Sequence, residues 1–427
     1  MSKIIEFFRS IGPAIIVAAV VCGPGSILMN SKVGAIYGYD MIWVLAIAAT
    51  LMWSMVVLSA RLGVVHRYSL LEELSQRLGR PISILIGLTL FLVVAGFQVS
   101  NNIAIIAAVE TFTDDLGRGG KIAFLFGLNA FIVFVIYGFR NLYGPIEKIM
   151  KGIVLFMITA FVVNLILAKP DLVSMLKGLM PSPPVGGYRA FFSNPTGGGD
   201  VLVLQALVAT TFSVAGAFYQ AYAVRAKGWK IGDARKGMID SLVGISVLFG
   251  VSLIVMCTAA AALHGRVGAG ELNSVSDIAK FLGPLFGPNA KYFFAAGIFA
   301  GGFGAFMVNA MIGGNMLSDG LGKGATINDA GARHGTLLAL FIGMVVAMVC
   351  ILLDLSVVNV ITIAQASTVL GLPALAAALV YLATRPDLTG ERKVPTWMIV
   401  MGSVGFLLSL MLTLRTVIRI YVSLSAK

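Results

Sequence analysis

Two short stretches of the chain combine residues that interrupt a helix with polar side chains that carry no charge. The first is Cys22-Gly23-Pro24-Gly25-Ser26, in the middle of an apolar run from Ile11 to about Gly38. Proline lacks a backbone N–H and glycine has a low helix propensity, so a helix should break here, at Pro24. Within a bilayer, unpaired backbone is tolerated only where protein buries it or where it lines a wet cavity. The stretch therefore predicts a polar cavity at mid-membrane.

A second interrupted stretch, Thr211–Ala217, lies at the corresponding position in the second half of the chain. A matched pair of broken helices is typical of a transporter's substrate site. The predicted substrate-binding residues come from both stretches and from two glutamines: Gly23, Pro24, Gly25, Ser26, Thr211, Ser213, Gly216, Gln220 and Gln365. Five more polar residues are predicted to take part in a pathway or in coupling: Asn30, Gln98, Asn101, Asn102 and Tyr219.

The chemistry expected of such a site is the binding of a small anion. A helix that starts at a break presents free N–H groups and the positive end of its dipole. The polar side chains near both breaks are uncharged, whereas hard divalent cations usually take carboxylate ligands and soft donors select transition metals. We therefore expect a small organic carboxylate, either amino-acid-like or a hydroxy acid. A divalent cation such as Mg²⁺ or Mn²⁺ at an atypical site is the alternative.

The composition indicates a polytopic α-helical membrane protein. The apolar fraction is 58%, the charged fraction is 12% and the mean hydropathy is +0.95, whereas a soluble domain has about 25% charged residues. Continuous apolar runs argue against a membrane β-barrel, whose strands alternate. We assign the net charge of +12 to basic loops rather than to nucleic-acid binding. No nucleophile–base pair, phosphate loop or metal cluster is evident, so neither an enzyme nor a cofactor is expected.

The hydropathy pattern predicts eleven membrane spans and one surface helix. Ser69-Leu70-Leu71-Glu72 matches a capping box that would start the surface helix. Acidic residues near span ends, such as Asp240 and Asp319, are expected at the interface. The predicted spans are Ile11–Ile36, Met41–Val65, Ile82–Val109, Ile122–Tyr137, Ile146–Ala168, Val201–Val224 (broken near Gly216), Gly237–Leu263, Tyr292–Leu317, Leu337–Leu353, Val357–Tyr381 and Trp397–Val422.

These spans predict a single transporter domain over residues 1–427. Residues 11–168 and 201–383 would form two five-helix repeats, which must have opposite orientations, and 397–422 a final helix. With the N-terminus in the cytoplasm, 19 of the 31 Lys and Arg residues lie on the cytoplasmic side. The positive-inside rule then predicts a multi-pass protein of the cell (inner) membrane with a cytoplasmic N-terminus. A monomer is expected.

Several motifs give the chain a resemblance to the NRAMP family of proton-coupled divalent-metal transporters. The resemblance implies the LeuT-type fold, with broken helices 1 and 6, and covers residues 12 to 390. The motifs that carry it are Gly12-Pro13-Ala14, Gly23-Pro24-Gly25-Ser26, Leu58-Ser59-Ala60-Arg61-Leu62-Gly63, Lys169-Pro170-Asp171, Ile363-Ala364-Gln365, Leu370-Gly371-Leu372-Pro373 and Arg385-Pro386-Asp387-Leu388.

The family's metal-binding positions differ in this chain. The resemblance places Gly23 and Ser26 where the family has the Asp and Asn of its DPGN motif. On helix 6, Val214 and Gly216 stand at the positions of the Met and His of the MPH motif. Asn101 stands at an acidic position linked to proton movement. We therefore predict an NRAMP-related secondary transporter, coupled to H⁺ or Na⁺, that has lost the transition-metal site.

Overall fold

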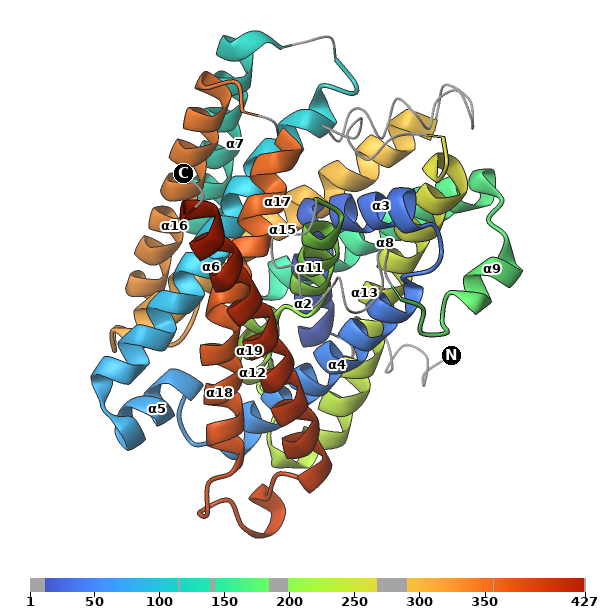
Figure 1. The fold of residues 1–427 in the computed structure, drawn as a ribbon. Helices are drawn as coiled ribbons and strands as arrows, with labels where there is room; N and C mark the ends of the chain where they lie inside the picture. The colour runs from blue at the N-terminus through green and yellow to red at the C-terminus, as the bar shows by residue number, and fades with distance from the viewer. Residues whose placement is uncertain are drawn as a thin grey trace, which may run out of the picture.

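The computed structural model describes residues 12–113, 116–138, 143–183, 199–266, 290–355 and 357–425. Within these ranges every secondary-structure element is a helix (Figure 1). Ten helices are long and apolar enough to cross a membrane, or eleven if the bent pair at the N-terminus is one span. This confirms the predicted all-α polytopic architecture.

The helices follow the predicted spans with modest changes at their ends. The largest change is at the ninth span, whose helix begins seven residues before the predicted Leu337. The elements in chain order are α2 (Pro13–Val21), α3 (Pro24–Tyr37), α4 (Ile42–Val65), α5 (Leu70–Leu78), α6 (Arg80–Val109), α7 (Gly117–Gly138), α8 (Tyr143–Ala168), α9 (Leu172–Lys177), α11 (Gly199–Thr211), α12 (Val214–Ala226), η1 (Ile231–Asp233), α13 (Ala234–Leu263), α15 (Ala290–Gly320), α16 (Ala330–Leu352), α17 (Val357–Ser367), η3 (Thr368–Gly371), α18 (Leu372–Ala383), η4 (Gly390–Arg392) and α19 (Thr396–Ser425).

The first span breaks where the sequence predicts. Helix α2 ends at Val21, α3 starts at Pro24, and the two axes differ by 57°. Gly23 is the N-cap of α3 and Pro24 its first residue, a position where the missing N–H costs no intrahelical bond. The local chemistry of Gly-Pro-Gly therefore decides the break.

The second break lies inside the predicted stretch Thr211–Ala217, three residues before Gly216. Helix α11 ends at Thr211 and α12 starts at Val214. Ser213 is the N-cap of α12, and its hydroxyl accepts a hydrogen bond from the N–H of Gly216 at 3.5 Å. A capping serine starts the new helix, while Gly216 stays within its first turn.

A third interruption divides the tenth predicted span. A short 3-10 turn, η3, separates α17 from α18. Pro373 lies in the first turn of α18, and proline cannot donate the hydrogen bond that would continue a helix from α17. The short turn therefore interrupts the predicted span Val357–Tyr381, and it was not anticipated from the sequence.

The surface helix is confirmed at α5. Ser69 is its N-cap, and the Ser69 hydroxyl accepts a hydrogen bond from the N–H of Glu72 at 3.2 Å. The cap satisfies one of the free N–H groups at the start of the helix. It therefore favours the start of this nine-residue helix shortly after α4 ends.

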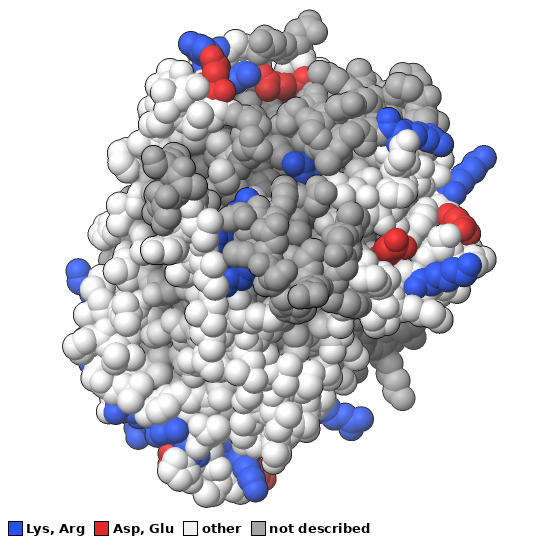
Figure 2. Space-filling view, in the orientation of Figure 1, with Lys and Arg blue, Asp and Glu red and all other residues white. Residues whose placement is uncertain are grey.

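The broken helices lie at the centre of the bundle (Figure 1). The apolar window of the α11–α12 span is 89% buried and that of α15 is 83% buried, against 22% for α7 and 28% for α19. Helices α7 and α19 therefore present most of their apolar surface outward, as lipid-facing helices do. In the view of Figure 2, Lys and Arg gather on the lower end, around α5 and the loop between α18 and α19.

Candidate functional site

A small cavity lies where the two broken helices meet. Its volume is about 20 Å³, enough for about one water molecule. The walls come from both breaks and from α6, α15 and α17. The lining residues are Val20, Val21, Gly23, Gly25, Ser26, Phe97, Asn101, Thr210, Ser213, Asn309 and Gln365.

Helix N-termini face this cavity. Gly23, Gly25 and Ser26 belong to the cap and first turn of α3, and Ser213 caps α12. The first N–H groups of a helix have no partner within it and carry the positive end of its dipole. This part of the wall is suited to an anion.

Helix C-termini face the cavity as well. Val20 and Val21 end α2, and Thr210 lies in the last turn of α11. The last carbonyl groups of a helix carry the negative end of the dipole. The cavity therefore has one wall suited to a negative group and another suited to a cation or a hydroxyl donor.

Gln365 of α17 closes one side of the cavity against Gly25. A Cβ atom added at Gly25 would lie 1.9 Å from Nε2 of Gln365 and 2.5 Å from its Cδ. Only glycine leaves room for this side chain. Gln365 is 3% exposed, and its Oε1 has no hydrogen-bond partner among the described residues. A buried carbonyl without a partner is costly, so it is a candidate ligand-binding atom.

The amides of α6 form a network in which only Asn101 reaches the cavity. Gln98 donates from Nε2 to the Phe306 carbonyl of α15 at 2.8 Å, and Asn101 donates to Oε1 of Gln98 at 3.0 Å. Asn102 donates to the Gln98 carbonyl and accepts from Asn129 of α7. Gln98 and Asn102 therefore hold helices together, and Asn101 is the pathway candidate that the structure brings to the site.

Several predicted residues lie outside the cavity. The ring of Pro24 packs beside Gly302 of α15, and Gly216 packs beside Val17 and Val21 of α2. Thr211, Asn30 and Gln220 are buried but do not line the cavity, and Tyr219 lines a larger space described below. Asn30 donates to the Ser26 carbonyl at 2.8 Å, so it supports the first turns of α3.

Gln220 instead contacts a buried carboxylate. Asp240, near the start of α13, is 1% exposed. Its two oxygens accept hydrogen bonds from the N–H groups of Gly12 and Ala14, each at 2.8 Å, and Gln220 donates to it at 3.3 Å. The carboxylate thus caps the N-terminus of α2, where an anion is stabilising.

Sequence reasoning missed Asn309 and Phe97 as lining residues, and it placed Thr210 near the second break without assigning it to the site. Asn309 lies on α15, among apolar residues and glycines. An asparagine within such a span was the available signal, because an amide facing lipid is costly.

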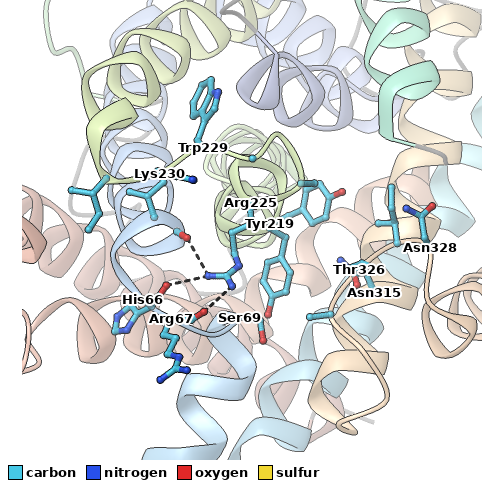
Figure 3. A pocket seen from close by; sticks show the side chains of 18 of the residues that line it. His66, Arg67, Ser69, Tyr219, Arg225, Trp229, Lys230, Asn315, Thr326 and Asn328 are labelled. Carbon is cyan, nitrogen blue, oxygen red and sulfur yellow. Dashed lines mark hydrogen bonds between the residues drawn. The ribbon is translucent and has the colours of Figure 1, made fainter.

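A larger vestibule lies at the end of the molecule where α4, α12 and α15 end (Figure 3). Its volume is about 940 Å³. Arg225 donates hydrogen bonds to the carbonyls of Gly63, His66, Arg67 and Tyr68, and so joins α12 to the end of α4. The polar residues on its walls are His66, Arg67, Ser69, Tyr219, Tyr222, Arg225, Lys230, Asn315, Thr326 and Asn328.

The fold and the two breaks define a polytopic membrane transporter. Residues 14–419 match the family of natural resistance-associated macrophage protein-like proteins, Nramp. The chain belongs to this family, and the predicted family resemblance is confirmed.

Similar proteins carry names of metal transporters. The chain is 26% identical, over 304 residues, to the divalent metal cation transporter MntH of Yersinia pestis, covering 71% of this chain and 70% of that one. It is 25% identical over 313 residues to MntH of Erwinia tasmaniensis, covering 72% and 71%. The crystal structure of the Eremococcus coleocola manganese transporter aligns with a TM-score of 0.76 at 17% identity, over 98% of this chain and 87% of that one.

Proposed function

We propose that this Nramp-family transporter moves a small organic carboxylate by alternating access, coupled to H⁺ or Na⁺. One observation carries the proposal. None of the described residues that line the central cavity has an ionisable side chain, while the first turn of α3 and the cap of α12 face it. A carboxylate would receive hydrogen bonds from the free N–H groups and from the hydroxyls of Ser26 and Ser213.

The opposite wall supports a second polar group on the same substrate. The carbonyl ends of α2 and α11 would accept hydrogen bonds from an ammonium or hydroxyl group. Amino acids and hydroxy acids carry both groups. The cavity of about 20 Å³ is smaller than either compound, so Gln365 must move away from Gly25 for the substrate to bind.

The second candidate substrate is a divalent metal cation, and the comparisons favour it. The relatives named above are divalent metal cation transporters. The carbonyl ends of α2 and α11, with the amide oxygens of Asn101, Asn309 and Gln365, could supply neutral oxygen ligands. Against this candidate stands the cost of holding a double charge within a membrane without a counter-charge at the site.

Ligand-dependent melting of the purified protein separates the two candidates. A ligand that binds only the folded state raises the melting temperature by mass action. We expect a rise with one or more amino or hydroxy acids and none with Mn²⁺ or Mg²⁺. A rise with a metal ion alone would support the second candidate and reject the first.

Two variants at one position sharpen this test. Gly23→Asp adds a carboxylate to the cavity and should remove the response to carboxylates by repulsion. A Cβ at Gly23 would lie 3.0 Å from the Cβ of Ala305, so Gly23→Ala is the control for added bulk. If both variants lose the response equally, bulk and not charge is the cause, and the anion proposal fails at this position.

A further inference from the structure

Three cations and, among the described residues, no acid line the vestibule. Arg67, Arg225 and Lys230 belong to its wall (Figure 3), and none of the described lining residues is Asp or Glu. Arg67 and Lys230 are exposed, and neither side chain forms an ion pair with an acid among the described residues. A cleft walled by charges of one sign concentrates ions of the other sign.

The acids nearest to the vestibule are engaged elsewhere. Asp319 of α15 lies behind the wall at 3% exposure, and accepts hydrogen bonds from Tyr222 at 2.6 Å and from Ser69 at 2.9 Å. Asp329 accepts a hydrogen bond from the backbone N–H of Thr326.

Two other acids on this end contact the wall of the vestibule from behind and pair with basic residues outside it. Asp233 binds Lys236 at 2.7 Å and accepts a hydrogen bond from the N–H of Lys230 at 3.1 Å. Glu73 binds Arg77 at 3.3 Å and lies 3.5 Å from Nδ1 of His66, whose pKa burial lowers. The described side chains that line the space itself therefore include three cations and no acid.

The folding of this region explains why the cations face the space. The loop after α4 wraps the guanidinium of Arg225, which holds the backbone of Arg67 and Tyr68 through their carbonyls. Lys230 follows Trp229, whose ring lies near Gly237 of α13. Contacts with neighbouring helices therefore hold the backbone that carries the exposed side chains of Arg67 and Lys230.

We propose that the vestibule is an anion-selective entrance, which attracts small carboxylates toward the central site and repels divalent cations. The inference rests on the proposed function only for the identity of the anion. The potential of the vestibule can be measured without any substrate, so the two proposals can fail separately.

The experiment uses charged thiol reagents on single cysteines. Ala226 is exposed at the vestibule wall, and Thr389 is exposed in the loop between α18 and α19. Each is replaced by Cys in the full-length protein, whose native Cys22, Cys257 and Cys350 are buried. The rate of modification by an anionic methanethiosulfonate is divided by the rate with its cationic analogue. This ratio cancels the intrinsic reactivity of each thiol.

We expect the anion-to-cation ratio at Ala226→Cys to exceed that at Thr389→Cys by about tenfold at low salt. The excess should fall in 1 M salt, where screening is strong. Adding Arg67→Gln and Lys230→Gln should lower the ratio by at least about threefold. Arg235→Gln, which removes an exposed charge from the first turn of α13 outside the vestibule, should leave it unchanged.

Two results would overturn the inference. One is an equal ratio at the two cysteines, which would mean that the vestibule has no special potential. The other is a fall with Arg235→Gln as large as with the vestibule substitutions, which would assign the effect to the general basic surface of this end. A high ratio without carboxylate binding would leave the entrance in place and reject only the proposed substrate.

Discussion

The side chain of Gln365 occupies the space that a Cβ on Gly25 would fill, with only 1.9 Å between that Cβ and Nε2 of the glutamine. The contact joins α17 to the first turn of α3 across the central cavity. It also places the unpartnered Oε1 of Gln365 in a buried position. The pair therefore links the third interrupted span to the first.

Gly25→Ala should prevent Gln365 from closing the cavity. We expect uptake to fall at least about tenfold, because the overlap must displace backbone or side chain in a packed region. The double variant Gly25→Ala/Gln365→Ala should recover part of the loss, since it removes the clashing group. Uptake by the two variants and by Gln365→Ala alone measures this coupling. Equal loss in the single and double glycine variants would show that the contact with Gln365 is not the cause.

Ser26→Ala should weaken substrate binding by about tenfold, which corresponds to one hydrogen bond of about 1.4 kcal/mol. Ser31→Ala is the matched control, because Ser31 is buried on the same helix and does not line the cavity. The concentration of substrate that half-saturates uptake gives the comparison. If Ser31→Ala has the same effect as Ser26→Ala, the hydroxyl of Ser26 has no specific part in binding.

Asp240→Ala should destabilise the protein by at least about 2 kcal/mol, because the N–H groups of Gly12 and Ala14 lose a charged acceptor in a buried place. Asp240→Asn keeps one carbonyl acceptor and should cost less. Thermal melting in detergent ranks the parent and the two variants. A stability of Asp240→Ala equal to that of the parent would show that the cap does not hold α2.

His66 should make the protein less stable in mild acid. Burial lowers its folded-state pKa below the ordinary 6.5. The unfolded chain then binds a proton more readily, so the stabilisation is present above pH 6.5 and is lost as the pH falls through the folded pKa. The melting temperature of the parent should drop more between pH 7.5 and 5.5 than that of His66→Gln. Parallel drops would exclude His66 as the titrating group.

The Arg77–Asp387 pair should stay intact over this range. The hydrogen bond from Arg77 lowers the pKa of Asp387 to about 2, so its carboxylate is ionised throughout. Asp387→Asn should therefore change the stability of the protein by the same amount at pH 7.5 and at pH 5.5. A variant whose effect vanishes at pH 5.5 would show that the carboxylate titrates in that interval.

Local chemistry made the span positions and the first break predictable. Proline at position 24 stops a helix through its covalent structure, whatever surrounds it. The predicted stretch Thr211–Ala217 contains the second break, and the side-chain cap at Ser213 decides where within it α12 starts. The hydropathy profile also gave no sign of η3, because a turn made of apolar residues leaves the mean hydropathy of the surrounding window unchanged.

Long-range partners could not be predicted from one sequence. Asp240 caps a helix that is distant in the sequence: it accepts hydrogen bonds from Gly12 and Ala14, which are 228 and 226 residues away. Its buried position depends on that partner. Asn309 faces the cavity because α15 packs against α6 and the first break. Likewise, only the fold brings Arg67, after α4, beside Arg225 of α12 and Lys230 of the connector that follows.

Uptake into liposomes tests the central claim most directly. Purified protein would be offered labelled amino and hydroxy acids in one arm and labelled Mn²⁺ in the other, each with and without an inward proton gradient. The proposal predicts saturable uptake of at least one carboxylate and Mn²⁺ uptake no faster than in empty vesicles. Saturable Mn²⁺ uptake without uptake of any carboxylate would contradict it and establish the divalent-cation function.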